Sequence, residues 1–203
     1  MSKWVGDGEK RVAALFRAAR KLGPSIVFLD EVDSVLSARA AGENESSTRM
    51  KTEFLVQLDG VGAEEEGRVL VLAATNRPAA LDDAVLRRLP RRVYIPLPET
   101  GARAQLLASL LRDTKHSLSR TDLTAIATAT EGFSGSDLKE LAREAAHAPV
   151  REARALGRTL SVDALRPVHR RDLEAALAVV RPSVDPSTIE AFNEYNEKFG
   201  SKV

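Results

Sequence analysis

Two short apolar runs, each ending abruptly in polar residues, constrain the fold of this chain most. Residues 26–29 are Ile, Val, Phe and Leu and precede Asp30 and Glu31, while the apolar residues 69–74 precede Thr75 and Asn76. A run that is apolar on both faces is typical of a strand buried within a parallel sheet. With a helical pattern between the two runs, the sequence predicts an α/β fold, in which ligands bind at the carboxyl ends of the strands.

Apolar residues at helical spacing predict further elements in the first half of the chain. One helix is expected over residues 9–22, because Gly23 and Pro24 then supply a left-handed cap and a residue that cannot continue a helix. A second helix is expected to run up to Leu58. A short third strand is expected over residues 92–95.

From residue 100 onward the pattern becomes wholly helical. Ser134 and Asp137 have the spacing of a capping box, which predicts the start of one helix, and Pro149 should end or kink that helix. A separate last helix is expected over residues 183–200. The sequence therefore predicts an all-helical part that follows the α/β part.

Composition excludes several classes of function. The 203 residues contain 30 Lys plus Arg against 29 Asp plus Glu, so the sequence has no nucleic-acid-binding signature. There is no Cys, which excludes disulfides and thiolate metal sites. No apolar run approaches the roughly 18 residues of a membrane span. We therefore expect a globular domain without a nucleic-acid partner, and membrane association only through segments outside this sequence.

Asp30 and Glu31 are the first candidates for chemistry. Adjacent carboxylates at the end of a buried strand repel each other and lose hydration, so their presence needs a reason. In phosphoryl-transfer enzymes one carboxylate supports Mg²⁺ and the next polarises the attacking water. Taken alone, the pair is more simply explained as a strand that ends in charged residues.

Three further residues could belong to the same site. The amide of Asn76 could orient a water or contact a terminal phosphate, although a turn is the simpler explanation of Asn-Arg-Pro. Arg87 and Arg88 could be a solvated edge. They could also be arginine fingers, which stabilise charge on a phosphate and are commonly supplied by a neighbouring subunit.

The order and spacing of five short motifs favour the catalytic explanation of these residues over the simpler ones. They are residues 26–31, 74–78 (Ala-Thr-Asn-Arg-Pro), 81–82 (Leu-Asp), 86–88 (Leu-Arg-Arg) and 132–138 (Gly-Phe-Ser-Gly-Ser-Asp-Leu). In this order, and across essentially the whole chain, the sequence resembles the AAA ATPases. The resemblance implies a partial AAA+ P-loop NTPase core, with a parallel sheet and flanking helices, followed by an all-helical small lid domain.

The resemblance also implies domain boundaries. Residues 1–98 would be the C-terminal part of the large α/β ATPase domain, 99–182 the helical lid, and 183–203 a C-terminal helix for ring assembly. ATP and Mg²⁺ are the implied cofactors. Asp30 would support Mg²⁺, Glu31 would be the catalytic base or water polariser, and Asn76 resembles the residue called sensor 1.

The remaining implied roles concern neighbouring subunits and the lid. Arg87 and Arg88 resemble the fingers that reach into the ATP site of the adjacent subunit, so activity would require a ring, normally a homo-hexamer. Pro90 restricts the backbone just after them and departs from the family pattern. Gly135 and Ser136 lie where family members approach the nucleotide from the lid.

Two segments resemble the loops that line the central pore of such rings. Lys3, Trp4 and Val5 resemble the first pore loop, in which an aromatic ring grips a polypeptide without sequence preference. Residues 38–49, which include Arg39 and Arg49, lie where a second pore loop would be. The alternative for the first segment is a disordered terminus with an incidental Trp.

Within the family, residues 180–184 and the last helix resemble the group of spastin, fidgetin, katanin and the ATPases that dismantle ESCRT-III filaments. Residues 84–88 and 132–138 are closest to spastin, whereas Trp4 and residues 94–99 are closer to fidgetin-like members. The implied function is microtubule severing, in which a basic pore pulls acidic tubulin tails. The implied location is cytoplasmic, at microtubules, with the nucleus as an alternative.

Two alternatives remain open. The chain could be an ATPase-dead interaction module, because it contains no Gly-x-x-x-x-Gly-Lys-Ser/Thr loop to hold the ATP phosphates. It could also act on ESCRT-III filaments, although residues 155–167 are too few for the extra β-domain of those enzymes. The family places the phosphate loop and two strands upstream of residue 1, and one of those strands lies between the strand before Asn76 and the strand near Tyr94. We therefore expect this chain alone to bind ATP poorly and to fold marginally.

Overall fold

The computed structural model describes residues 7–38, 45–61, 68–157, 161 and 164–201. The chain divides into two compact units, residues 1–92 with 201–203 and residues 93–200. Each unit is described here by itself. Within the described ranges, no helix has both the length and the apolar character needed to cross a membrane.

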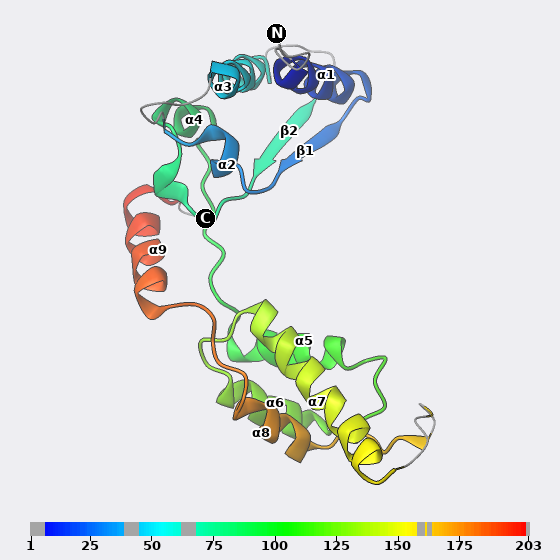
Figure 1. Cartoon of the computed structure of the whole chain (residues 1–203). Coiled ribbons are helices and arrows are strands. Elements are labelled where there is room, and N and C mark those ends of the chain that lie inside the picture. The colour runs from blue at the N-terminus through cyan, green and yellow to red at the C-terminus, as the bar shows by residue number, and fades with distance from the viewer. Residues whose placement is uncertain (1–6, 39–44, 62–67, 158–160, 162–163, 202–203) are drawn as a thin grey trace. The chain divides into compact units, whose positions relative to one another are not determined.

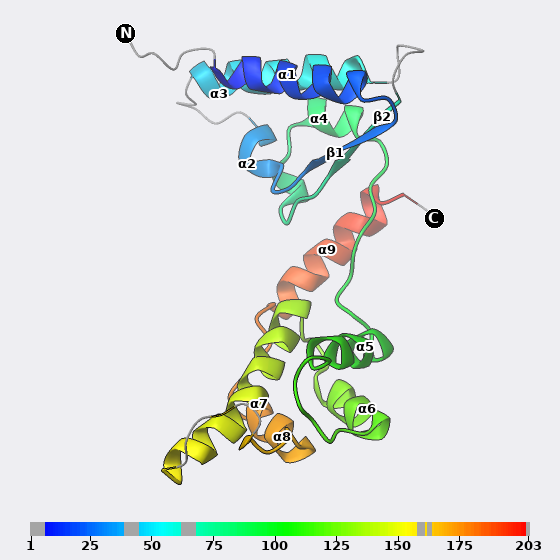
Figure 2. The same ribbon diagram turned by 90° about the vertical axis from the view of Figure 1, so that its right-hand side faces the viewer.

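Unit 1 is built around a two-stranded parallel sheet. Strands β1 (Ser25–Leu29) and β2 (Val69–Ala73) pair in register, so that Leu29 lies opposite Ala73. The parallel sheet and its flanking helices confirm the predicted α/β class. The helices of this unit are α1 (Asp7–Lys21), α2 (Asp33–Leu36), α3 (Glu45–Asp59) and α4 (Asp83–Arg88), with a 3₁₀ turn at Pro78–Ala80. Helices α1 and α3 lie side by side in Figures 1 and 2.

One face of the sheet packs on the core of unit 1. Val27 of β1 is buried, and Phe16 of α1 meets Phe54 of α3 edge to face, with ring centroids 6.2 Å apart. The other core residues are Val12, Val32, Leu36, Leu58, Leu81 and Val85. This burial fixes β1, and with it the polar residues that follow β1.

The opposite face of the sheet is exposed. Ile26, Phe28, Leu70 and Leu72 point to that face and are between 53% and 67% exposed. Ile26 pairs with Leu70 and Phe28 with Leu72, so the four side chains form a continuous apolar surface. The prediction that both strands are buried on two faces is therefore wrong for the described chain, in which only one face is covered.

The predicted strand at residues 92–95 does not form. These residues belong to no regular element. The backbone N–H of Arg92 instead donates to Ser201 Oγ at 3.0 Å, and the N–H of Ser201 donates to the Arg92 carbonyl at 2.8 Å. A strand needs a neighbouring strand for its backbone hydrogen bonds, and the part of the chain that the structure describes offers none here.

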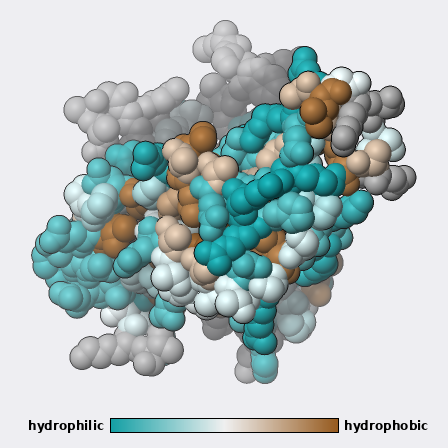
Figure 3. All heavy atoms as spheres, turned by 90° about the horizontal axis from the view of Figure 1, so that it is seen from below, coloured by the Kyte–Doolittle hydropathy of each residue, from teal (hydrophilic) through white to brown (hydrophobic). Residues whose placement is uncertain are grey.

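Unit 2 is helical, as predicted. It contains α5 (Thr100–Leu110), α6 (Arg120–Ala129), α7 (Gly135–Ala155), α8 (Arg170–Leu177) and α9 (Pro186–Phe199). Leu107, Ile126, Leu138 and Leu173 are fully or almost fully buried between α5, α6, α7 and α8. Large apolar side chains also remain exposed in this unit, among them Ile95 and Val179. Figure 3 shows apolar residues among hydrophilic ones on the surface that faces the viewer.

Local sequence signals determine where α7 begins but not where it ends. The predicted capping box is present, because Ser134 Oγ accepts from the Asp137 N–H and the Asp137 carboxylate accepts from the Ser134 N–H. Of the two predicted effects of Pro149, an end or a kink, the end is wrong, since α7 continues to Ala155. The Pro149 ring is buried, and packing of α7 against α5 and α8 offsets the hydrogen bond that proline cannot donate.

A partly buried ion pair holds the loop before α8. Arg166 donates to both carboxylate oxygens of Asp172, at 2.7 and 2.9 Å, and also to Glu152 at 2.6 Å. Asp172 is only 6% exposed. Its burial favours a higher pKa, but the hydrogen bonds from Arg166 and from the His169 N–H outweigh burial, so the pKa of Asp172 lies below its ordinary value.

Asp172→Asn should therefore destabilise unit 2 by about 2 kcal/mol near neutral pH, because Arg166 loses its bidentate partner. Since folding lowers the pKa of Asp172, its contribution is present above about pH 4, the ordinary pKa, and is lost as the pH falls below it. Urea unfolding at about pH 7 and about pH 3 tests both points. Glu174→Gln, on the exposed side of α8, is the control, and equal losses at both pH values would contradict the assignment.

Candidate active site

The polar residues that follow β1 and β2 lie together at one edge of the sheet. Beyond the paired ends of the strands, the Ala74 N–H donates to the Leu29 carbonyl at 2.8 Å and the Val32 N–H donates to the Ala74 carbonyl at 3.0 Å. Thr75 Oγ1 donates to Asp33 Oδ1 at 2.6 Å. These bonds tie the segment of Asp30 and Glu31 to the segment of Asn76, so the structure brings the three predicted residues to the same edge.

The backbone at Glu31 is strained. Its φ is 48°, and among the described residues other than glycine it is the one with a positive φ. The Glu31 N–H donates to Asp30 Oδ1 at 2.9 Å, and both side chains are exposed. Such left-handed conformations cost energy and cluster at functional sites. The turn directs the Glu31 side chain differently from a residue that continues the strand.

Replacing Glu31 by Gly should stabilise unit 1 by about 0.5–1 kcal/mol, because glycine adopts a positive φ without the steric cost but loses more chain entropy. Chemical unfolding of the purified chain measures this difference. Glu31→Ala retains the Cβ atom and should give no such gain. A gain with Ala as large as the gain with Gly would show that the side chain, and not the backbone, is the source of strain.

The acidic residues at this edge suit Mg²⁺ only together with phosphate oxygens. No cluster of three or more His, Cys, Asp or Glu that could hold a metal occurs among the described residues. Mg²⁺ is usually held by one or two carboxylates, substrate phosphates and waters rather than by an all-protein cage. Asp30 and Glu31 therefore fit a metal that arrives with a nucleotide.

Arg87 and Arg88 end helix α4, which Asp82 begins. Asp82 Oδ1 accepts from the Ala84 N–H at 2.8 Å, as an N-cap does. Arg88 forms a bidentate ion pair with Asp59 at the end of α3, with Nε–Oδ1 and Nη2–Oδ2 distances of 2.7 and 2.6 Å. Arg87 is exposed. The two predicted fingers therefore have different surroundings.

Gly135 and Ser136 are the first two residues of α7, and both are exposed. They lie between the two residues of the capping box, Ser134 and Asp137, which fixes the backbone at this helix start. They belong to unit 2, so their predicted approach to a nucleotide stays a prediction. Nearby, the buried carboxylate of Asp137 also accepts from the Ser183 N–H at 3.3 Å, which ties the segment before α9 to the start of α7.

Most of the predicted pore residues lie outside the described ranges. Lys3, Trp4, Val5 and Arg39 are among the residues that the structure does not describe. Arg49 lies within α3, where it pairs with Glu45 at 2.9 Å and approaches Glu9 at 3.9 Å. Its role in a pore loop stays a prediction, and these two carboxylates partly offset its charge.

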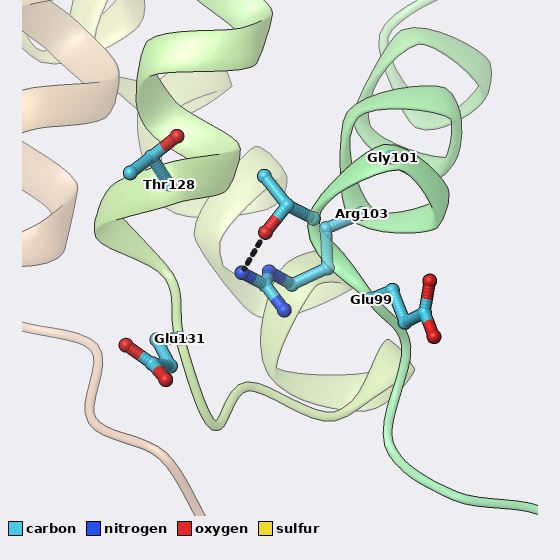
Figure 4. Close-up of a pocket in the computed structure, with 6 residues that line it drawn as sticks. Glu99, Gly101, Arg103, Thr128 and Glu131 are labelled. Atoms are coloured by element: carbon cyan, nitrogen blue, oxygen red, sulfur yellow. Dashed lines mark hydrogen bonds between the residues drawn. The ribbon is translucent and has the colours of Figure 1, made fainter.

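A pocket at the start of α5 is lined by none of the predicted site residues. It is lined by Glu99, Thr100, Gly101, Arg103, Thr128 and Glu131. Arg103 Nη2 donates to Thr100 Oγ1 at 3.0 Å, and Figure 4 shows Glu99 and Glu131 on either side of the Arg103 guanidinium. Arg103 also donates to the carbonyls of Pro98 and Ala127, so its hydrogen bonds are used within unit 2. With two carboxylates at its rim, this pocket does not suit a phosphate.

Sequence reasoning missed three residues that hold the site together. Asp33 and Thr75 join the two strand ends through their side chains. Asp59 binds Arg88. The residues of the Asp59–Arg88 pair are 29 positions apart, so no local pattern in the sequence could have revealed it.

Comparison with protein families agrees with this geometry. Residues 1–97 match the model of the ATPase family associated with various cellular activities (AAA). Residues 120–162 match the AAA+ lid domain, and residues 163–200 match the Vps4 C-terminal oligomerisation domain. These matches confirm the predicted fold class, which is a large AAA domain followed by a helical lid.

Individual relatives indicate which group within the family this chain resembles. The chain is 50% identical over 199 residues to Fidgetin-like protein 1 of Caenorhabditis briggsae and 49% identical over 205 residues to Spastin of Naegleria gruberi. These matches cover 98% and 99% of this chain but 34% and 39% of those proteins. The chain therefore spans less than two fifths of their length.

A solved structure, the FIGL-1 AAA domain in complex with ADP, superposes with a TM-score of 0.88 at 47% identity. The match covers 99% of this chain and 66% of that one. Sequence motifs, strand-end geometry, family models and solved relatives thus agree with one another. The chain belongs to the AAA ATPase family, in the group that contains spastin and the fidgetin-like proteins.

Proposed function

We propose that this chain is the catalytic and lid portion of an ATP-hydrolysing AAA motor that severs microtubules. The observation that carries the proposal is the joined pair of strand ends, where Asp30, Glu31 and Asn76 follow two parallel strands tied by backbone hydrogen bonds. The complex of the similar FIGL-1 AAA domain with ADP supports nucleotide binding. The similarity to proteins named Spastin supports microtubules as the target of the motor.

Each residue at the strand ends has a distinct task in this proposal. Bound Mg²⁺ would neutralise charge on the ATP phosphates, and Asp30 would hold its coordination sphere. Glu31 accepts a proton from the attacking water, and its carboxylate has no hydrogen bond or ion pair within the described chain that would block this. Asn76 orients that water or contacts the terminal phosphate. Gly135 and Ser136 approach the nucleotide from the lid.

The neighbouring subunit completes the site. Arg87 is an exposed cation at the end of a helix and is suited to stabilise charge that develops on the phosphate of an adjacent subunit. Residues 163–200, which match an oligomerisation domain, support a ring, for which we propose a homo-hexamer. Lys3, Trp4, Val5, Arg39 and Arg49 would line its pore and attract acidic tubulin tails, less strongly at high salt. A motor of this kind acts in the cytoplasm at microtubules.

Imaging of taxol-stabilised microtubules tests whether microtubules are the target of this motor. The experiment uses ATP and an extended chain, in which a Gly-x-x-x-x-Gly-Lys-Ser/Thr loop and the two strands that the family places upstream precede residue 1. Breaks that form along the microtubules with the extended chain, and not with its Glu31→Gln variant, are the expected result. ATP hydrolysis that leaves microtubules intact would contradict severing.

The alternative is that the 203-residue chain is an ATPase-dead interaction module, while the extended chain hydrolyses ATP. Such a module would retain the oligomerisation contacts and inhibit rings of active subunits. Adding the 203-residue chain to the extended chain tests this alternative directly, because an inactive partner should lower ATP turnover as it enters the rings.

A further inference from the structure

The two arginines at the end of α4 are not equivalent. Every nitrogen of the Arg88 guanidinium has an acceptor within its own subunit, since Nε and Nη2 donate to Asp59 and Nη1 donates to the Ala84 carbonyl at 3.1 Å. Arg87 is exposed, and no hydrogen bond or ion pair to it occurs within the described residues. A guanidinium with all its nitrogens engaged is poorly placed to bind a phosphate in another subunit, whereas Arg87 is available.

The contact of Arg88 with Asp59 joins two helices. Asp59 is the last residue of α3, and Arg88 is the last residue of α4. Helix α4 has only six residues, so its own hydrogen bonds fix its direction weakly and packing must fix the rest. Val85, on the same helix, is fully buried in the core of unit 1. Two attachments, Val85 and Arg88, therefore determine both the position and the rotation of α4.

The rotation of α4 decides where Arg87 points. Consecutive residues of an α-helix project about 100° apart, so a helix that turns Arg88 toward α3 turns Arg87 away from it. Bidentate arginine–carboxylate pairs are geometrically specific, unlike most ion pairs at a surface. The hydrogen bonds with Arg88 also hold the pKa of Asp59 below its ordinary value, so that the carboxylate is ionised near neutral pH.

We infer that Asp59 is a positioning residue for ATP hydrolysis, which clamps Arg88 and thereby directs Arg87 alone into the nucleotide site of the neighbouring subunit. The inference rests on the proposed function, in which the finger acts between subunits. It divides the predicted pair of fingers into one catalytic residue, Arg87, and one residue, Arg88, that acts through the backbone of α4.

Steady-state ATP turnover by variants of the extended chain tests this division. Arg87→Ala should lower kcat by about 10³-fold or more, as the loss of an arginine finger does. Asp59→Asn and Arg88→Ala should each lower kcat by about tenfold with little change in KM, because they misdirect a group that acts mainly in the transition state. The double variant should be no worse than Arg88→Ala, because both changes break one contact.

Mixing of subunits separates positioning from damage to the site itself. Subunits with Glu31→Gln cannot hydrolyse ATP but present an intact Arg87, whereas Asp59→Asn subunits have an intact Glu31. Turnover of the mixture above the sum of the two separate preparations is expected. If Asp59→Asn merely damaged its own subunit, no such gain would appear.

Glu140→Gln is the matched control, since Glu140 also forms an exposed ion pair with an arginine, Arg143, at 2.6 Å. It should leave kcat unchanged. Full activity of Asp59→Asn, or a higher activity than that of the parent chain, would overturn the inference, and the latter would show that Asp59 sequesters the finger. If the parent extended chain itself does not hydrolyse ATP, the proposed function fails, and this inference fails with it.

Discussion

Glu31→Gln is expected to lower ATP turnover by the extended chain about 10²- to 10⁴-fold, the usual contribution of a general base. Glutamine has the same shape but cannot accept the proton of the attacking water. The substitution leaves the strand ends intact, because the hydrogen bond at this turn runs from the Glu31 backbone N–H to Asp30. Phosphate release measures turnover, and a fluorescent ATP analogue measures binding.

Phosphate release and binding of the ATP analogue together distinguish a loss of catalysis from a loss of folding. Binding of the ATP analogue should stay within about twofold of the parent value, since the side chain acts on water rather than on the nucleotide. Glu174→Gln, on the exposed side of α8, is a control that should change neither quantity. Retained turnover in Glu31→Gln, or loss of binding together with turnover, would remove Glu31 from the role of catalytic base.

The 203-residue chain alone is expected to bind ATP at least about 100-fold more weakly than the extended chain. A phosphate-binding loop contributes several backbone N–H groups and a lysine, and each factor of ten in affinity requires about 1.4 kcal/mol. The sequence contains no such loop. Isothermal titration of both chains with ATP measures the difference.

The same comparison should show a gain in stability. In the extended chain, an added strand can pair with the edge of the sheet, and added helices can cover the apolar face of Ile26, Phe28, Leu70 and Leu72. The melting temperature of unit 1 should therefore rise and its tendency to aggregate should fall. Tight ATP binding by the 203-residue chain would contradict this account of the site.

Local signals in the sequence predicted the elements that depend on local interactions. The capping box of Ser134 and Asp137 was found because its two residues are three positions apart. A second box, formed by Ser119 and Asp122 before α6, was missed although it has the same spacing and could have been found. The apolar runs of β1 and β2 were also recognisable, because a short, continuous apolar run bounded by turn residues is typical of a strand.

The wrong predictions concern interactions with residues that are distant in the sequence. Residues 92–95 have the composition of a strand but lack a neighbouring strand, and Pro149 is tolerated because distant helices pack against α7. The bidentate contact between Asp59 and Arg88, and the positive φ of Glu31, arise only when separate segments meet in the folded chain. Neither feature could be predicted from the sequence alone.

A mixture of two inactive variants tests most directly whether ATP is hydrolysed between subunits. Extended chains with Glu31→Gln lack the base, and extended chains with Arg87→Ala lack the finger, so each preparation alone should show almost no ATP turnover. Mixed rings contain interfaces at which an intact Glu31 meets an intact Arg87 from the next subunit. We predict turnover well above the sum of the separate preparations. An inactive mixture of subunits that assemble together would contradict a site shared between neighbours.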